Sequence, residues 1–231
     1  MRTFFFFLCL LLLLPVNHLS AQKNITRRQV ERVSDEHEAL SPRKGFRATL
    51  GGGYAYRLGT MEKSGSKELD DFTSGLRNGF NIDTELQYFF QENFGVGLNA
   101  NYISQSKTAS GVLDIPGIGE TPNYKESNRY IYVGPSFAMR FENTEWGFHM
   151  SAGYGAIFFT NEGRAGSLKA SIDKTTFGSY IGVAGERRLS RNMGIGLKVS
   201  AVAGTVKIEG FRERMSVSNL FVTAFVSFRS N

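Results

Sequence analysis

Apolar and polar residues alternate along several long runs of this chain. The first run has Phe46, Ala48, Leu50, Tyr54 and Tyr56 in one phase, and mostly Gly, Thr, Ala and Arg in the other. Seven further runs show the same period at 80–90, 94–102, 130–141, 146–158, 177–188, 193–203 and 218–228. A period of two places successive side chains on opposite faces of a strand. The pattern therefore predicts eight β-strands.

Short and long connections alternate between these runs. Short turns lie at Gln91–Asn93, Glu142–Glu145 and Ser190–Asn192, and longer links lie at 59–76, 106–128, 161–173 and 208–216. Each predicted hairpin must pair like faces when it is folded about its turn. The alignments that do so are Glu85 with Asn99, Ala138 with His149, and Ala184 with Lys198. The connections predict an antiparallel, up-and-down arrangement.

The length and composition of the runs indicate which face points inward. Most runs are roughly 11 to 15 residues long, against about 5–6 for an ordinary strand and about 9–11 for a tilted membrane strand. The polar phase is rich in Gly, Ala and Ser, which suits a narrow interior, and aromatic residues gather at both ends of the apolar phase. These features favour a polar lumen and a lipid-facing exterior. A soluble, lipocalin-like barrel with the opposite facing is the alternative.

The residues before the first strand have a different character. Residues 1–21 contain Arg2, an apolar run from Phe4 to Leu14 and a small-residue end at Ser20-Ala21, which is typical of a secretory signal peptide. Residues 22–45 are polar with charges of both signs, so we expect a flexible, periplasmic tail. Residues 46–231 are expected to form the barrel domain.

Cysteine and charge content narrow the possible functions. Cys9 is the only cysteine and lies within the expected signal peptide, so the mature chain has no thiol for a disulfide or a metal site. The net charge is +6, of which Arg2 accounts for one, leaving +5 spread along the mature chain. Such a dispersed charge predicts a solvated basic surface and no nucleic-acid partner.

The pattern resembles a known class of membrane protein. The eight runs, the Ser20-Ala21-Gln22 junction and the echoed turns Asn93-Phe-Gly-Val-Gly-Leu98 and Asn192-Met-Gly-Ile-Gly-Leu197 resemble the small outer-membrane barrels of the outer membrane protein A type, in particular the Bacteroidetes outer-membrane β-barrel domain. The resemblance covers Phe46 to Phe228. It implies an all-β, eight-stranded antiparallel up-and-down transmembrane β-barrel in the outer membrane of a Gram-negative bacterium, with short periplasmic turns and long extracellular loops.

The resemblance also implies partners. They are outer-membrane lipid and lipopolysaccharide, the barrel assembly machinery, and a possible extracellular ligand of the loops; no cofactor and no metal are implied. Some residues fit the pattern poorly. Pro135 lies within a strand, where it removes a ladder donor, and Phe221 and Phe225 fall on the inward phase. The class usually ends on an aromatic residue, whereas Phe228 is followed by three further residues.

Charged residues on the inward phase are the candidate site. They are Arg47, Arg57, Asp83, Glu85, Arg140, Glu186, Arg188 and Lys198. A buried charge without a partner is strongly penalised, so we expect a cluster of salt bridges that closes the lumen. A gated conduit for small ions is the alternative, although eight strands leave little room for one.

Catalysis is not predicted. His149 is the only histidine in the predicted barrel and Ser151 is next on its face, so a Ser/His pair can be drawn. The lipid A-modifying enzymes of this architecture act near the outer leaflet, whereas His149 lies near a periplasmic turn, and we expect it to be a hydrogen-bonding residue of the lumen. The sequence thus predicts a non-enzymatic outer-membrane protein with a structural or surface-interaction role. A small diffusion channel and an outer-leaflet lipid-modifying enzyme are the alternatives.

Overall fold

The structure, a computed structural model, describes residues 44–59, 66–115, 119–207 and 214–230. The predicted signal peptide and all but the last two residues of the predicted periplasmic tail lie outside these ranges. Among the described residues, no helix is both long enough and apolar enough to cross a membrane.

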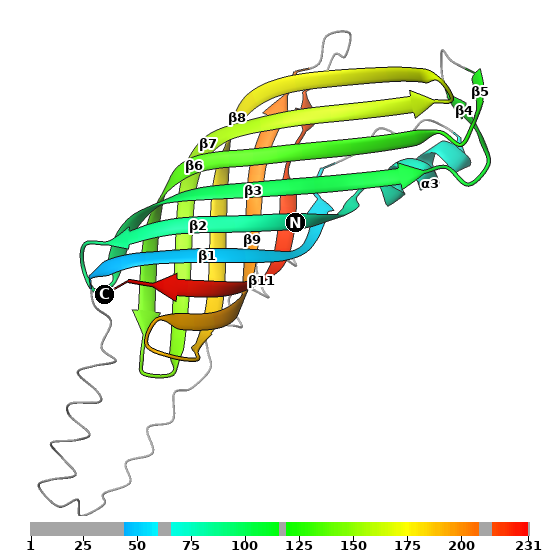
Figure 1. Cartoon of the computed structure of the whole chain (residues 1–231). Helices are drawn as coiled ribbons and strands as arrows, with labels where there is room; N and C mark the ends of the chain where they lie inside the picture. The colour runs from blue at the N-terminus through cyan, green and yellow to red at the C-terminus, as the bar shows by residue number, and fades with distance from the viewer. Residues whose placement is uncertain (1–43, 60–65, 116–118, 208–213, 231) are drawn as a thin grey trace, which may run out of the picture. The chain divides into compact units, whose positions relative to one another are not determined.

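Eight strands form one closed antiparallel barrel (Figure 1). The strands are β1 (Gly45–Arg57), β2 (Asn78–Phe89), β3 (Phe94–Thr108), β6 (Lys125–Glu142), β7 (Trp146–Ala165), β8 (Leu168–Arg188), β9 (Met193–Val206) and β11 (Asn219–Arg229). Strands that follow one another around the barrel are hydrogen-bonded, and β11 pairs with β1 to close it. This arrangement confirms the predicted eight-stranded, up-and-down topology.

The two ends of the barrel differ. The end with the three short turns is named here the turn end. The other end, named the loop end, carries helix α3 (Lys67–Gly75), the small hairpin of β4 (Val112–Ile115) and β5 (Gly119–Pro122), and β10 (Met215–Ser216), which pairs with β9.

Four strands continue beyond the barrel at the loop end. β3, β6, β7 and β8 stay paired with one another out to Thr108, Lys125, Ala165 and Leu168, and this extension is named here the wall (Figure 1). The prediction of a loop at 161–173 is therefore wrong, because β7 and β8 form a hairpin whose turn contains Gly166 at φ +60°. Both faces of this hairpin are largely polar, so the alternation that marks a membrane strand is missing there.

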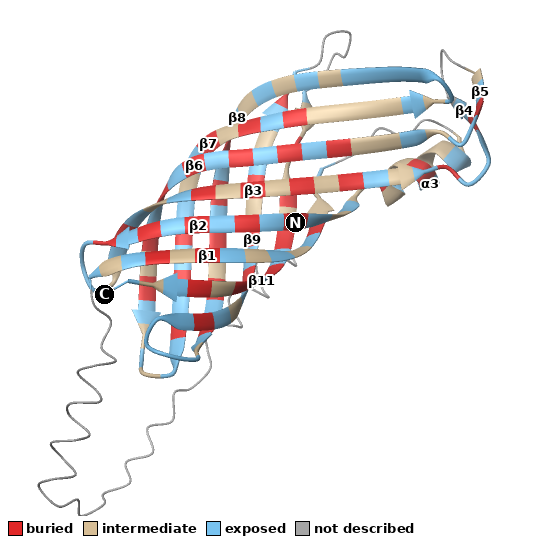
Figure 2. Ribbon diagram, viewed as in Figure 1, coloured by how far each residue is buried: buried red, intermediate tan, exposed pale blue. Residues whose placement is uncertain are grey.

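The apolar phase of the barrel strands faces outward. Leu50, Leu86 and Val96 are each at least half exposed, whereas Asp83 and Asn99 of the polar phase are completely buried. Figure 2 shows this as an alternation of exposed and buried positions along the strands. An apolar exterior of this extent is incompatible with a water-soluble barrel and matches the lipid-facing band of a membrane barrel. The lipocalin-like alternative is therefore wrong.

Two of the three predicted hairpin registers are confirmed. Glu85 pairs with Asn99 and Ala184 pairs with Lys198. In the β6–β7 hairpin, His149 lies opposite Arg140 and not opposite Ala138, so the prediction was wrong by two residues. The turn tightens around Asn143, whose Oδ1 accepts the N–H groups of Glu145 and Trp146 at 2.9 and 2.7 Å. A shift of two preserves which face is inside.

The residues that fitted the pattern poorly have local explanations. Pro135 lies opposite Leu98 of β3, and the β6–β7 pairing is interrupted at Gly134 and Pro135, as expected where an N–H donor is missing. A Cβ on Gly134 would lie 2.7 Å from Gly155 Cα, so the two strands approach closely there. Phe221 and Phe225 do point inward and are buried.

Candidate functional site

The lumen is filled by side chains in layers, and the layer at the turn end is ionic. Its centre is Glu186 of β8, which is completely buried. Arg47 donates to Glu186 Oε2 from Nη2 and Nε at 2.8 and 3.2 Å. Arg229 and Ser227 of β11 each donate to Glu186 Oε1 at 2.6 Å. One carboxylate therefore joins β8 to β1 and β11 inside the barrel.

Glu142 is the second carboxylate of this layer. Arg188 Nη2 donates to its Oε2 at 2.5 Å, and Arg229 Nη2 lies 2.8 Å from its Oε1. His149 Nε2 lies 3.2 Å from Glu142 Oε1 and 3.4 Å from Glu186 Oε2. Arg140 places its guanidinium 4.1 Å from the centre of the Phe89 ring and donates from Nε to a backbone carbonyl of the first turn at 2.7 Å.

A second ionic group lies deeper in the lumen, around Glu85 and Asp83 of β2. Lys198 donates to Asp83 and lies 3.2 Å from Glu85 Oε1. Tyr180 and Asn99 donate to the same Glu85 oxygen at 2.9 and 2.7 Å. Each charge of this group has partners from other strands, as burial demands.

Arg47 connects the two ionic groups. Besides holding Glu186, it donates from Nη1 to Gln87 Oε1 at 2.8 Å and lies 3.8 Å from Glu85 Oε2. Among the described residues, the joined network contains five cations and four carboxylates, together with His149. The cations are Arg47, Arg140, Arg188, Lys198 and Arg229, and the carboxylates are Asp83, Glu85, Glu142 and Glu186. The near balance of charge is what a sealed interior requires.

An aromatic and aliphatic layer fills the lumen on the loop-end side of these ions. The rings of Tyr132 and Tyr180 are stacked with centroids 5.6 Å apart, and those of Tyr130 and Phe159 lie 5.0 Å apart. The buried residues of the layer are Ala55, Ile103, Tyr130, Tyr132, Ile157, Phe159, Tyr180, Val202, Val206, Val217 and Phe221. The sequence predicted a polar lumen, and this half of the lumen differs from that prediction because it is filled by aromatic and aliphatic side chains.

Polar side chains cover this layer at the loop end. Gln105 Nε2 donates to Asn219 Oδ1 at 3.1 Å, and Asn161 Nδ2 donates to Asn128 Oδ1 at 2.8 Å. Arg57 also lies here and donates to the Ser216 carbonyl at 3.0 Å. Arg57 is thus separated from the ionic network by the aromatic layer, although the sequence grouped it with the other seven inward charges.

Glu142 and Arg229 belong to the network although they were not among the residues chosen from the sequence. Glu142 was assigned to a turn, and Arg229 follows the last residue of the predicted eighth strand. Glu142 lies two residues after Arg140, and Arg229 lies two residues after Ser227. Each therefore continues the inward-facing phase of its strand. Extending each run by one residue would have found them.

The buried Ser151 and His149 do not form a catalytic pair. Ser151 Oγ donates to Glu85 at 3.2 Å, whereas His149 Nε2 contacts Glu142 and Glu186. Both side chains are almost fully buried, so no substrate could reach them. Among the described residues, no group of three or more His, Cys, Asp and Glu is placed to hold a metal ion.

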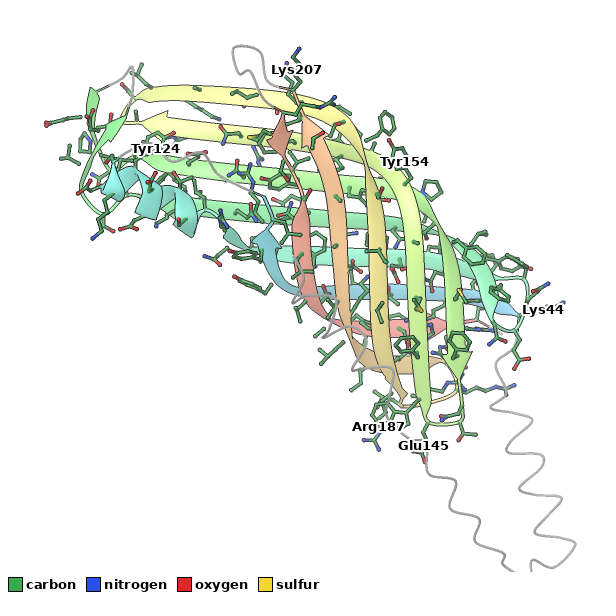
Figure 3. The ribbon with its side chains drawn as sticks, turned by 180° about the vertical axis from the view of Figure 1, so that it is seen from behind. Lys44, Tyr124, Glu145, Tyr154, Arg187 and Lys207 are labelled. Carbon is green, nitrogen blue, oxygen red and sulfur yellow. The ribbon has the colours of Figure 1, made fainter. Side chains whose placement is uncertain are left out.

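The loop end has a small hydrophobic core of its own. Phe72 and Leu76, from α3 and its C-terminal end, are buried against Leu113 of β4, and the Phe72 ring lies 5.5 Å from that of Tyr124. Lys107 of β3 donates to the Asp71 carbonyl at 2.7 Å and so ties the helix to the wall. Burial raises the pKa of Tyr124 to about 12. Figure 3 shows Tyr124 near α3, and Glu145 and Arg187 at the turn end.

Comparisons with known proteins identify the fold. No family model matches the chain, and no curated protein matches it. Among solved structures, Neisserial surface protein A is 11% identical with a TM-score of 0.52, covering 80% of this chain and 96% of that one. The attachment invasion locus protein Ail of Yersinia pestis, solved with the heparin analogue sucrose octasulfate, is 11% identical with a TM-score of 0.50, covering 81% of this chain and 100% of that one.

An enzyme is also among the similar structures. The outer-membrane protease OmpT of Escherichia coli is 12% identical with a TM-score of 0.42, covering 82% of this chain and 98% of that one. A likeness at that level carries no argument about catalysis. The chain has the fold of the small eight-stranded outer-membrane β-barrels.

Proposed function

Because the chain has this fold, we propose that it is a non-enzymatic, integral protein of a Gram-negative outer membrane, in which a sealed barrel anchors a surface-interaction platform. The platform is the ordered loop end: α3, the β4–β5 hairpin and the wall. In this proposal the loop end faces outward, residues 1–21 are a signal peptide, and residues 22–45 lie in the periplasm. The partners are membrane lipid, lipopolysaccharide and an extracellular ligand.

The sealed lumen is the observation that carries the proposal. Arg47 and Glu186 near the turn end are at most 1% exposed, and Tyr132 and Phe221 in the aromatic layer are completely buried. A diffusion channel needs a continuous water path, so the side chains lining it would be accessible. The ionic layer and the aromatic layer instead block any continuous water path through the lumen, which favours an anchor over a channel.

Conductance in a planar lipid bilayer tests this part of the proposal. The refolded mature protein, checked for a shift in gel mobility on boiling, is expected to insert without producing steady ohmic steps. A reproducible unitary conductance that changes in Glu85→Gln or Lys198→Gln would show that ions pass through the lumen and would overturn the sealed anchor.

The orientation has its own test, because the mature chain has no cysteine. Ser167→Cys places a thiol in the exposed β7–β8 turn at the loop end, and Glu145→Cys places one in an exposed turn at the other end. In intact cells, a membrane-impermeant maleimide is expected to label the Ser167→Cys protein and to spare the Glu145→Cys protein until the outer membrane is permeabilised. The reverse pattern would contradict the orientation.

A further inference from the structure

The outward face of the wall carries a cluster of cations. Lys125 and Arg129 lie on β6, Arg164 lies on β7 and Lys169 lies on β8, and all four are exposed. Pairing of Lys125 with Arg164, and of Arg164 with Lys169, sets these residues side by side across three strands. These four residues and Glu162 are named here the wall patch.

Glu162 is the carboxylate at the centre of the wall patch. It forms an ion pair with Arg129 and lies 3.5 Å from Lys169 Nζ. Among the described residues, Lys125 and Arg164 have no carboxylate partner within salt-bridge distance. Four cations surround one carboxylate, so the wall patch has a formal charge of +3. All five residues of the wall patch line one pocket, together with Ser127 and Gly163.

The wall patch lies directly beyond the apolar band of the barrel. A second groove joins the two surfaces and carries a further carboxylate. It is lined by Tyr102, Arg129, Ile131, Phe158, Thr160, Glu162, Ser171 and Asp173. Arg129 and Lys125 lie two and six residues beyond Ile131 on the same face of β6, which corresponds to about 7 and 20 Å along the strand. Aromatic residues at the end of a lipid-facing band mark the membrane interface, so the cations stand where the headgroups of neighbouring lipids begin.

We propose that the wall patch binds the phosphate groups of lipopolysaccharide in the outer leaflet. Arginine binds phosphate oxygens with two parallel N–H donors, and lysine supplies compact positive charge. Acyl chains would lie against Tyr102, Ile131 and Phe158 while the phosphorylated sugars reach the four cations. This inference rests on the proposed function, because it requires the loop end to face the cell exterior.

The spacing of the cations favours lipopolysaccharide over other anions. Lys125 and Arg129 are four residues apart, or about 13 Å along β6, which is farther than one phospholipid phosphate can bridge. Several phosphates on one sugar backbone can contact both. The wall patch also faces sideways, continuous with the lipid-facing groove, whereas a soluble sulfated glycan would have easiest access to the tips of the loops.

Binding of lipid A by the refolded mature protein tests the proposal. Native mass spectrometry in detergent would compare wild type with Arg129→Gln/Arg164→Gln, using bisphosphorylated lipid A as the probe. The matched control is Arg187→Gln/Arg191→Gln, which removes two exposed arginines from the turn end. Loss of two charge-assisted phosphate contacts is expected to weaken binding about tenfold or more, and the control pair is expected to bind like wild type. Heat-modifiable gel migration would establish that each variant is folded.

Competition experiments distinguish lipopolysaccharide from other anionic ligands. Monophosphorylated lipid A is expected to bind more weakly than the bisphosphorylated form, and phosphatidylglycerol more weakly still. Equal binding of phosphatidylglycerol, or displacement of lipid A by sucrose octasulfate at equal concentration, would overturn the assignment to lipopolysaccharide. Equal losses in both variant pairs would also overturn it.

The maleimide experiment keeps this inference separate from the function it rests on. If Ser167→Cys is labelled from outside and the wall patch variants still bind lipid A normally, then only the present inference fails. If Ser167→Cys is labelled only after permeabilisation, the orientation fails and the inference fails with it.

Discussion

The two halves of the lumen close the same barrel with different chemistry. Near the turn end, carboxylates such as Glu186 are held by guanidinium groups from other strands. Near the loop end, stacked rings such as Tyr132 and Tyr180 fill the same width without charge. The stability of the ionic half depends on hydrogen bonds with defined geometry, whereas that of the aromatic half depends on side chains that fill the available volume. The same alternation of side chains along the strands therefore supports both an ionic and an aromatic filling of the lumen.

The largest effect is expected from removing one charge of the ionic half. Glu186→Gln keeps the size of the side chain but leaves Arg47 and Arg229 without their shared carboxylate. Breaking a buried ion pair from one side costs about 3–5 kcal/mol, so the free energy of unfolding should fall by that order. Urea-induced unfolding of the refolded barrel, followed by gel mobility, measures it.

An exposed carboxylate is the control for this variant. Glu145→Gln at the turn end changes the charge equally and is expected to leave the urea midpoint unchanged within error. If Glu186→Gln were no more destabilising than Glu145→Gln, the ionic half would be dispensable and the contrast between the two halves would fail.

A smaller loss is expected in the aromatic half. Phe221→Ala removes a completely buried ring from β11 and should cost about 3 kcal/mol through lost burial and a residual cavity. Phe221→Leu should recover most of this loss, because volume is what the layer requires. Phe228→Ala on the outward face of the same strand is the matched control. A Phe228→Ala loss equal to that of Phe221→Ala would show that the lumen layer adds nothing beyond lipid contact.

The smallest effect is expected at the wall patch. Arg129→Gln breaks the ion pair with Glu162, but the Arg129 side chain is 44% exposed. Solvent-screened pairs contribute at most about 1 kcal/mol, so the urea midpoint should hardly move. A loss comparable to that of Glu186→Gln would mean that the wall is part of the folding core.

The barrel itself could be predicted from the sequence, because a membrane imposes alternation on every strand that crosses it. The strands, their facing and the buried positions of Asp83, Glu85 and Lys198 all follow from that period. The period cannot distinguish shifts of two residues, and for this reason the pairing of His149 was wrong while its inward facing was right.

The missed features lie where the membrane imposes no such pattern. The β7–β8 hairpin of the wall carries mostly polar side chains on both faces, so its sequence has no alternation of apolar and polar residues. The aromatic layer was missed because Tyr130 and Tyr132 occupy the polar phase and were not recognised as filling the interior. The role of Arg229 was hidden by its place after the last apolar residue.

The open edge of the wall has a consequence for a crowded membrane. β8 is paired with β9 only from Gly178 onward, so residues 168–177 have β7 as their one paired neighbour among the described strands. An exposed strand edge can be extended by a strand from another molecule. Here the edge carries Lys169, Asp173 and Lys174, and charged side chains of this kind discourage such joining. The same polarity that conceals this hairpin from sequence inspection would keep adjacent barrels from fusing into a continuous sheet.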